Sequence, residues 1–189
     1  MPKARTLLKI LVGVCAIVAP ALHSTSDILE WYQHGLTPSQ LWLSYIAFLP
    51  MPWLLFGICF LHEPKLGILG FVGALLYGLA FTYFTHTTLY ALAEKIPSYP
   101  ALWPRLGWLY TVYGTFMIYG ALLFAWSAWR AAWLPRFSVL LFSSGIAINL
   151  LLWLFGAPDS WQTIGSAVRN MGLISIGHAI LFNRTRRPI

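Results

Sequence analysis

The segment from Leu66 to Tyr90 reads LGILGFVGALLYGLAFTYFTHTTLY and contains no Asp, Glu, Lys or Arg. The hydrocarbon core of a bilayer is about 30 Å thick, and an α-helix of about 20 mainly apolar residues crosses it. This segment is long enough to do so. The strands of a membrane barrel alternate apolar and polar side chains, whereas this segment is apolar without alternation. It therefore predicts a transmembrane helix.

The composition extends this prediction to the whole chain. Of its 189 residues, 59% are hydrophobic and only 9% are charged, with a mean hydropathy of +0.71. A soluble domain carries about 25% charged residues, so most of this surface must face lipid. We expect residues 1–189 to form a single transmembrane helical domain, an all-α polytopic membrane bundle. Its six or so helices would span Leu7–Glu30, Leu41–Leu61, Leu66–Tyr90, Gly107–Trp129, Phe137–Phe155 and Trp161–Phe182.

Two proline-rich stretches interrupt the apolar pattern. Pro50 and Pro52 lie near the centre of the second predicted helix. Proline lacks the N–H that bonds to the carbonyl four residues back, so the pair predicts a kink. Residues 96–104, rich in proline and tyrosine, predict a loop between the third and fourth helices.

The distribution of Lys and Arg predicts that both ends of the chain are cytoplasmic. Short cytoplasmic loops are enriched in these residues. With the N-terminus inside, the outer loops contain only Lys95 and Arg105. The inner segments contain Lys3, Arg5, Lys9, Lys65, Arg130, Arg136, Arg184, Arg186 and Arg187.

The basic N-terminal residues before Ile10–Leu22 also match the beginning of a signal peptide. We expect a retained first helix, because its removal would leave an odd number of helices and the wrong charge balance. The compact loops favour a bacterial plasma membrane, although an endoplasmic-reticulum protein would look similar.

The net charge of +7 does not indicate a nucleic-acid partner. The basic residues flank hydrophobic segments and form no patch with aromatic residues on a soluble domain. We expect the lipid bilayer as the partner, with a second membrane protein as a further candidate.

The first predicted helix carries the most informative polar residues. His23, Asp27, Glu30 and His34 are spaced so that their side chains share one face of a helix. His23 and Asp27 follow the apolar run directly, so we expect them in the outer half of the bilayer. Glu30 and His34 lie nearer the interface, where water can solvate them.

The last predicted helix contains Arg169 and Asn170. A charge in a spanning helix costs about 3 kcal/mol on insertion scales and usually faces the bundle interior with a partner. Arg169 would lie about 12 Å below the outer edge at 1.5 Å per residue. Asp27 and Glu30 are the acidic residues that could reach it, and a side chain that leans toward the interface is the alternative.

Other polar residues fall at the same expected depth. His86 lies near the outer end of the third helix, Tyr110 and Tyr113 begin the fourth, and Asn149 lies in the outer half of the fifth. Each alone is more often a contact between helices than a ligand. Together with Arg169 they predict a polar pocket in the outer leaflet.

We expect this pocket to bind, carry or transport a lipid-like or amphipathic small molecule, since such sites are largely apolar with a few convergent polar groups. The apolar body would lie among aromatic side chains. The polar head would contact residues drawn from Glu30, Tyr110, Tyr113, Asn149, Arg169 and Asn170.

Three other functions fit the same residues. The first is an intramembrane isomerase or hydrolase, in which His23 and His86 would act as general acid or base. Asp27 would then orient an imidazole, and Arg169 would stabilise the negative charge that develops in the reaction. No motif of a defined reaction type is present. A structural subunit would use these side chains for packing alone. The third alternative is a metalloprotein. Zinc or iron could be ligated by His23, Asp27, Glu30 and His86, and a haem could be ligated by the two histidines, but the spacing of these residues matches no metal motif. We therefore expect no metal site and leave the cofactor open.

Overall fold

The computed structural model describes residues 2–61 and 66–182, and every regular element in these ranges is a helix. The all-α class is therefore confirmed. Four of the basic residues behind the predicted orientation, at positions 65, 184, 186 and 187, lie outside the described residues. The helices are α1 (Pro2–Gln33), α2 (Pro38–Phe48), α3 (Met51–Leu61), α4 (Gly67–Ala93), α5 (Tyr99–Leu106), α6 (Trp108–Ala131), α7 (Arg136–Leu154) and α8 (Asp159–Leu181).

Five helical segments are long and apolar enough to cross a membrane: Lys3–Gln33, Pro38–Leu61, Gly67–Ala93, Trp108–Ala131 and Arg136–Leu154. They confirm that five of the six predicted segments are long apolar helices, and they support an integral membrane protein. The 23-residue α8 is also long enough. It carries Gln162, Arg169, Asn170 and His178 along its length, which makes it less apolar. A sixth span in α8 stays a prediction.

The predicted kink in the second span is confirmed as a break between α2 and α3. The N–H of Leu49 still donates to the Tyr45 carbonyl at 3.1 Å, and that of Trp53 donates to the Pro50 carbonyl at 3.2 Å. Pro50 and Pro52 have no N–H to donate, so the regular ladder cannot pass through them. The two short helices together form one span.

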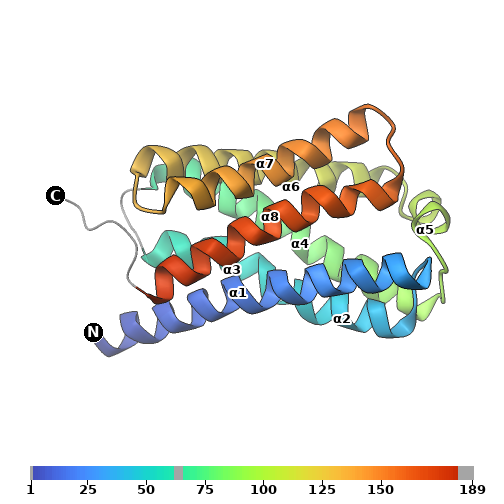
Figure 1. Ribbon diagram of the computed structural model, residues 1–189, viewed down its shortest axis with the longest axis horizontal. Helices are drawn as coiled ribbons and strands as arrows, with labels where there is room; N and C mark the ends of the chain where they lie inside the picture. The colour runs from blue at the N-terminus through green and yellow to red at the C-terminus, as the bar shows by residue number, and fades with distance from the viewer. Residues whose placement is uncertain (1, 62–65, 183–189) are drawn as a thin grey trace.

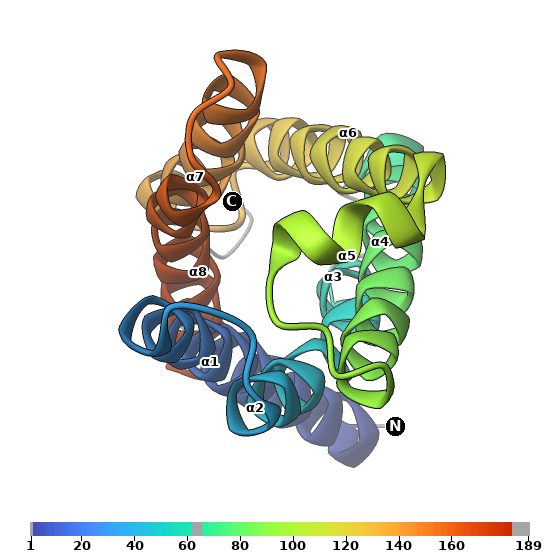
Figure 2. The same cartoon turned by 90° about the vertical axis from the view of Figure 1, so that its right-hand side faces the viewer.

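The loop predicted for residues 96–104 was wrong in part, because α5 forms there. Pro100 occupies its first turn, where a helix needs no N–H donor. Figures 1 and 2 show α5 at one end of the bundle. Its Leu102 is buried in a small apolar cluster, and this contact outweighs the tendency of the prolines to form a loop. The other buried members are Leu36, Leu41, Ala91 and Ile96.

The helices form a closed ring when viewed along the bundle (Figure 2). α1 packs against α2 and α3, these pack against α4, and the ring continues through α6, α7 and α8 back to α1. Figure 1 shows that α1 begins and α8 ends at the same end of the bundle. This arrangement agrees with an even number of crossings.

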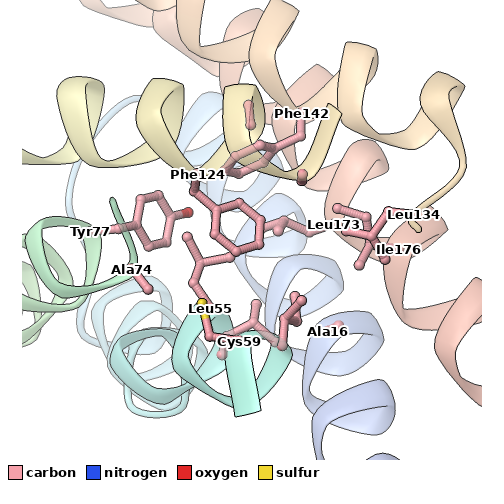
Figure 3. Close-up of a cluster of buried hydrophobic side chains, with 14 of the residues drawn as sticks. Ala16, Leu55, Cys59, Ala74, Tyr77, Phe124, Leu134, Phe142, Leu173 and Ile176 are labelled. Atoms are coloured by element: carbon pink, nitrogen blue, oxygen red, sulfur yellow. The ribbon is translucent and has the colours of Figure 1, made fainter. Parts of the chain in front are cut away.

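Large aromatic side chains fill the centre of the ring. Tyr77, Phe81, Phe124 and Phe142 are fully buried. The ring centroid of Tyr77 lies 4.7 Å from that of Phe81 and 6.0 Å from that of Phe142, which are favourable aromatic separations. Figure 3 shows three of these rings beside apolar side chains from α1, α3 and α8. Polar groups that enter this centre are surrounded by apolar surface.

Glycines bring the backbones of α7 and α8 into contact. A Cβ atom on Gly145 would lie 2.5 Å from the Gly165 carbonyl oxygen and 2.6 Å from Arg169 Cα. A Cβ atom on Gly165 would lie 2.8 Å from the Gly145 carbonyl oxygen. At Gly145 the obstructing atoms are all backbone, so no side-chain rotation can make room there. The contact holds the Arg169 backbone directly against α7.

We expect Gly145→Ala to lower the free energy of unfolding by about 1–3 kcal/mol, the range typical of overpacking. The matched control is Gly114→Ala in α6, where nothing lies within 4 Å of the added Cβ. The control should be unchanged or up to about 1 kcal/mol more stable, since alanine favours helix. Thermal and denaturant unfolding in detergent measure both. Equal stability of the two variants would contradict the close contact.

The predicted orientation can be tested with single cysteines at opposite ends of the bundle. Arg105 lies in α5 and Arg130 at the end of α6, and both are exposed. On a background with Cys15→Ala and Cys59→Ala, Arg105→Cys should react with an impermeant thiol reagent on intact cells. Arg130→Cys should react only after the membrane is opened. The reverse pattern would show that the orientation is inverted.

Candidate functional site

α1 and α8 bring one ionisable side chain each to a shared position inside the ring. Arg169 of α8 is 2% exposed and His23 of α1 is 8% exposed. The expectation that Arg169 faces the bundle interior is therefore confirmed. Arg169 lies about 15 Å along α8 at 1.5 Å per residue, near the middle of this 23-residue helix.

The Arg169 guanidinium is surrounded by neutral side chains. Its Nη2 lies 3.0 Å from His23 Nδ1. Nε and Nη2 donate to Asn170 Oδ1 at 3.3 and 3.2 Å, and Nη1 donates to Met117 Sδ at 3.7 Å. The ring of Phe81 lies 5.8 Å from Cζ, within range of a cation–π contact.

His23 links Arg169 to Asp27. A guanidinium can only donate hydrogen bonds, so His23 Nδ1 must accept and the ring proton must lie on Nε2. Nε2 is 3.5 Å from Asp27 Oδ1. Phe48 packs edge-on against the imidazole, with ring centroids 4.7 Å apart. Arg169 therefore reaches Asp27 through an imidazole, where the sequence suggested a direct ion pair with Asp27 or Glu30.

Two contacts between a basic and an acidic side chain are found among the described residues, and Arg169 takes part in neither. They join the neutral imidazole of His23 to Asp27 and the exposed Arg105 to Glu94. Asp27 experiences the charges of both Arg169 and Glu30. Glu30 is half-buried, about one turn further along α1. The positive charge of Arg169 is thus balanced at a distance and without direct contact to a carboxylate.

Asn170 sets the orientation of the guanidinium. Its side chain is fully buried, and Oδ1 accepts from Arg169. Its Nδ2 donates to Ser24 Oγ at 3.0 Å. One donor and one acceptor thus fix the amide, which joins α8 to α1 beside the buried charge.

A separate neutral cluster joins α1 to α2. Ser26 Oγ donates to the Gln40 carbonyl at 3.2 Å, and Gln40 Nε2 donates to Ser26 Oγ at 3.0 Å and to Ser44 Oγ at 3.1 Å. All three side chains are buried. This cluster positions α2, which carries the Phe48 ring against His23. Its role is structural.

Two polar atoms near the buried charge have no hydrogen-bond partner within the part of the chain that the structure describes. They are Asp27 Oδ2 and Tyr77 Oη. A third such atom, Gln40 Oε1, belongs to the neutral cluster. The Tyr77 hydroxyl experiences the charge of Arg169, and Figure 3 shows this side chain pointing into the aromatic core. Asp27 and Tyr77 therefore leave hydrogen-bonding capacity unused inside the bundle.

His86, Tyr110 and Tyr113 lie in an aromatic group between α4 and α6. His86 is exposed, and its ring centroid is 6.4 Å from that of Tyr83. Tyr113 stacks on Tyr83 at 4.2 Å with 8° between the ring planes. Tyr110 lies 5.9 Å from Phe84. The expected convergence of these three side chains on Arg169 is not seen in these contacts, and their catalytic or binding roles stay predictions.

Asn149 connects α7 to α8 about one turn from Gly145. Its Nδ2 lies 3.4 Å from Ser166 Oγ. The Gln162 amide, turned so that its nitrogen faces α7, donates to Asn149 Oδ1 at 3.3 Å. These bonds are the polar contacts between membrane helices that asparagine commonly makes. A ligand contact for Asn149 stays a prediction.

An apolar groove of about 700 Å³ lies between α1 and α8. Many of its side chains are exposed, so the groove faces outward from the ring. Trp31 Nε1 donates to the Ser160 carbonyl at 3.0 Å and joins the two helices there. His34, the last residue of the predicted polar stripe, is among the lining residues. They are Ile28, Trp31, Tyr32, His34, Thr163, Ile164, Ala167, Val168 and Met171.

The sequence pattern did not indicate three residues of the site, Ser24, Tyr77 and Met117. Ser24 is adjacent to His23 but lies off the stripe defined by three- and four-residue spacing. Met117 lies in a largely apolar run and gives no signal of its own. Tyr77 gives a weak one, because a hydroxyl in an otherwise apolar run needs a partner when it is buried.

Within residues 2–61 and 66–182, no three His, Cys, Asp or Glu side chains come together as metal ligands would. Comparison of the chain with protein-family models, with curated protein sequences and with solved structures finds no match.

We expect Tyr77→Phe to raise the free energy of unfolding of ligand-free protein by about 1 kcal/mol. A buried hydroxyl without a partner costs about 1–3 kcal/mol, and phenylalanine keeps the aromatic packing. Tyr119→Phe, at an exposed position of α6, is the control and should change stability by less than about 0.5 kcal/mol. Denaturant unfolding in detergent measures both. A clear loss of stability in Tyr77→Phe would show that the hydroxyl has a partner.

Proposed function

We propose that this integral membrane protein binds an amphipathic small molecule, with a negatively charged headgroup placed against Arg169 inside the bundle. One observation carries the proposal: the Arg169 guanidinium is 2% exposed and contacts no carboxylate among the described residues. A buried charge is strongly unfavourable unless it is paired and hydrogen-bonded. An anionic headgroup would provide the missing partner.

The contacts of Arg169 support an anion in particular. Guanidinium binds carboxylate and phosphate oxygens through two parallel hydrogen bonds. Nη1 has the thioether sulfur of Met117 as its acceptor, at 3.7 Å, and sulfur is a weak acceptor. An oxyanion would replace a weak contact with a strong one. The nearby rings of Phe81 and Phe48 suit the apolar part of such a molecule.

The geometry favours binding over acid–base catalysis. A general base needs a ring nitrogen within reach of the substrate proton. Nδ1 of His23 faces Arg169 and Nε2 faces Asp27, so His23 is occupied on both sides. An enzymatic role for His23 would first require Arg169 to move away.

Mass spectrometry of molecules that co-purify with the protein tests the proposal. From detergent-purified wild type we expect an anionic amphiphile in about equimolar amount. Arg169→Gln should lower its recovery at least fivefold, because the neutral amide cannot compensate an anion. Arg130→Gln removes an exposed arginine at the end of α6 and should leave recovery unchanged.

Two measurements keep this test decisive. Circular dichroism and thermal unfolding identify variants that do not fold, and Arg169→Lys then replaces Arg169→Gln. Lysine keeps the charge but lacks the planar fork of arginine, so recovery should fall between those of wild type and a neutral variant. Equal recovery from wild type and a folded Arg169→Gln protein would exclude Arg169 as the headgroup site. Wild type without any bound amphiphile would favour a purely structural subunit.

A further inference from the structure

The buried site offers a hydrogen-bond acceptor as well as a cation. Asp27 Oδ2 is buried and has no partner in the described part of the chain. On the other side of His23, Arg169 Nη1 contacts only a sulfur atom among the described residues. The site therefore has one unused acceptor and one poorly used donor, separated by an imidazole ring.

Such unused capacity is uncommon in a folded protein. About 90% or more of buried polar groups have a hydrogen-bond partner, and exceptions call for an explanation such as a bound water or ion. The Tyr77 hydroxyl is a further buried group without a partner near the same charge. An anion at Arg169 would satisfy the donor and leave the Asp27 oxygen unpaired. A single ligand could satisfy both Arg169 and the Asp27 oxygen only if it carried a hydrogen-bond donor in addition to its anionic group.

We infer that the headgroup is zwitterionic, with an anionic oxyacid on Arg169 and a primary ammonium on Asp27. This inference rests on the proposed binding function and specifies its ligand. The two poles of the site have opposite formal charge, and His23 holds them a fixed distance apart through both ring nitrogens. A phosphate joined to an ammonium by a short linker has matching poles.

The carboxylate of Asp27 requires N–H donors on the ligand. A primary ammonium has three of them, whereas a quaternary ammonium has the same charge and none. The fully methylated headgroup should therefore lose the hydrogen bond to Oδ2 and be too large for a buried position. A phosphate without an ammonium should lose the whole contact with Asp27.

Three monoacyl phospholipids of identical chain length provide the probes: the phosphoethanolamine, phosphocholine and phosphate monoester forms. Their dissociation constants are measured on detergent-purified wild type by native mass spectrometry or calorimetry. We expect the phosphoethanolamine probe to bind about tenfold more tightly than either of the others, which corresponds to about 1.4 kcal/mol. This comparison needs no variant and does not depend on any mutant folding.

Variants then assign the preference to its residues. Asp27→Asn should remove the preference for phosphoethanolamine and change the affinity for the phosphate monoester less than threefold. Arg169→Lys should weaken all three probes. Glu94→Gln, which removes an exposed carboxylate paired with Arg105, is the control and should bind like wild type.

The outcomes separate this inference from the function on which it rests. If wild type binds none of the probes, the proposed function itself fails for this ligand class. If wild type binds all three equally, or if folded Asp27→Asn keeps the preference, the zwitterionic headgroup is wrong while anion binding at Arg169 stands. A preference for the phosphoethanolamine probe that is lost in Asp27→Asn supports both the proposed function and the zwitterionic headgroup.

Discussion

The burial of one guanidinium between the last helix and the first is the constraint on which this structure depends. Arg169 can be 2% exposed only because α8 packs against α1 on one side and against α7 on the other. The absence of a side chain at Gly145 lets the backbone of α8 at Arg169 lie directly against α7. His23 and Asn170 then supply the hydrogen bonds that make the buried charge tolerable. Closure of the ring and burial of the charge therefore depend on each other.

The way in which the charge is compensated matters more for function than its burial. A direct Arg–Asp ion pair would satisfy both groups and leave nothing for a ligand. Here the imidazole of His23 stands between them, so that each charged group keeps part of its hydrogen-bonding capacity. The neutral cluster of Ser26, Gln40 and Ser44 uses the same helix for packing. Its side chains carry no charge, so an unmet bond there has a smaller electrostatic cost than one at Asp27.

The sequence was sufficient for the helices and for the buried position of Arg169, because apolar length and the cost of a charge in lipid act locally. It was insufficient for α5, where apolar contacts of Leu102 outweigh the prolines around it. Helical spacing placed His23 and Asp27 on one face, but it could not show that the imidazole would accept from Arg169. Depth alone grouped His86 and Tyr113 with Arg169, whereas rotation about α4 and α6 places them in a different contact. The depth of a residue in the bilayer follows from its position along the helix. The direction that its side chain faces depends on how the helix packs against its neighbours.

The energetic cost of this arrangement is itself an argument for a ligand. A well-packed apolar side chain at a buried ionic position is often as stable as the charge it replaces, or more so. An apolar side chain at position 169 would lie near the ring of Phe81, which is 5.8 Å from the Arg169 Cζ, and would need no polar partner. Local rules of stability are usually broken at functional sites, where the cost is offset elsewhere. A buried guanidinium and a carboxylate with one buried, unpartnered oxygen, held apart by an imidazole, are what a site needs if its ligand brings the missing charges.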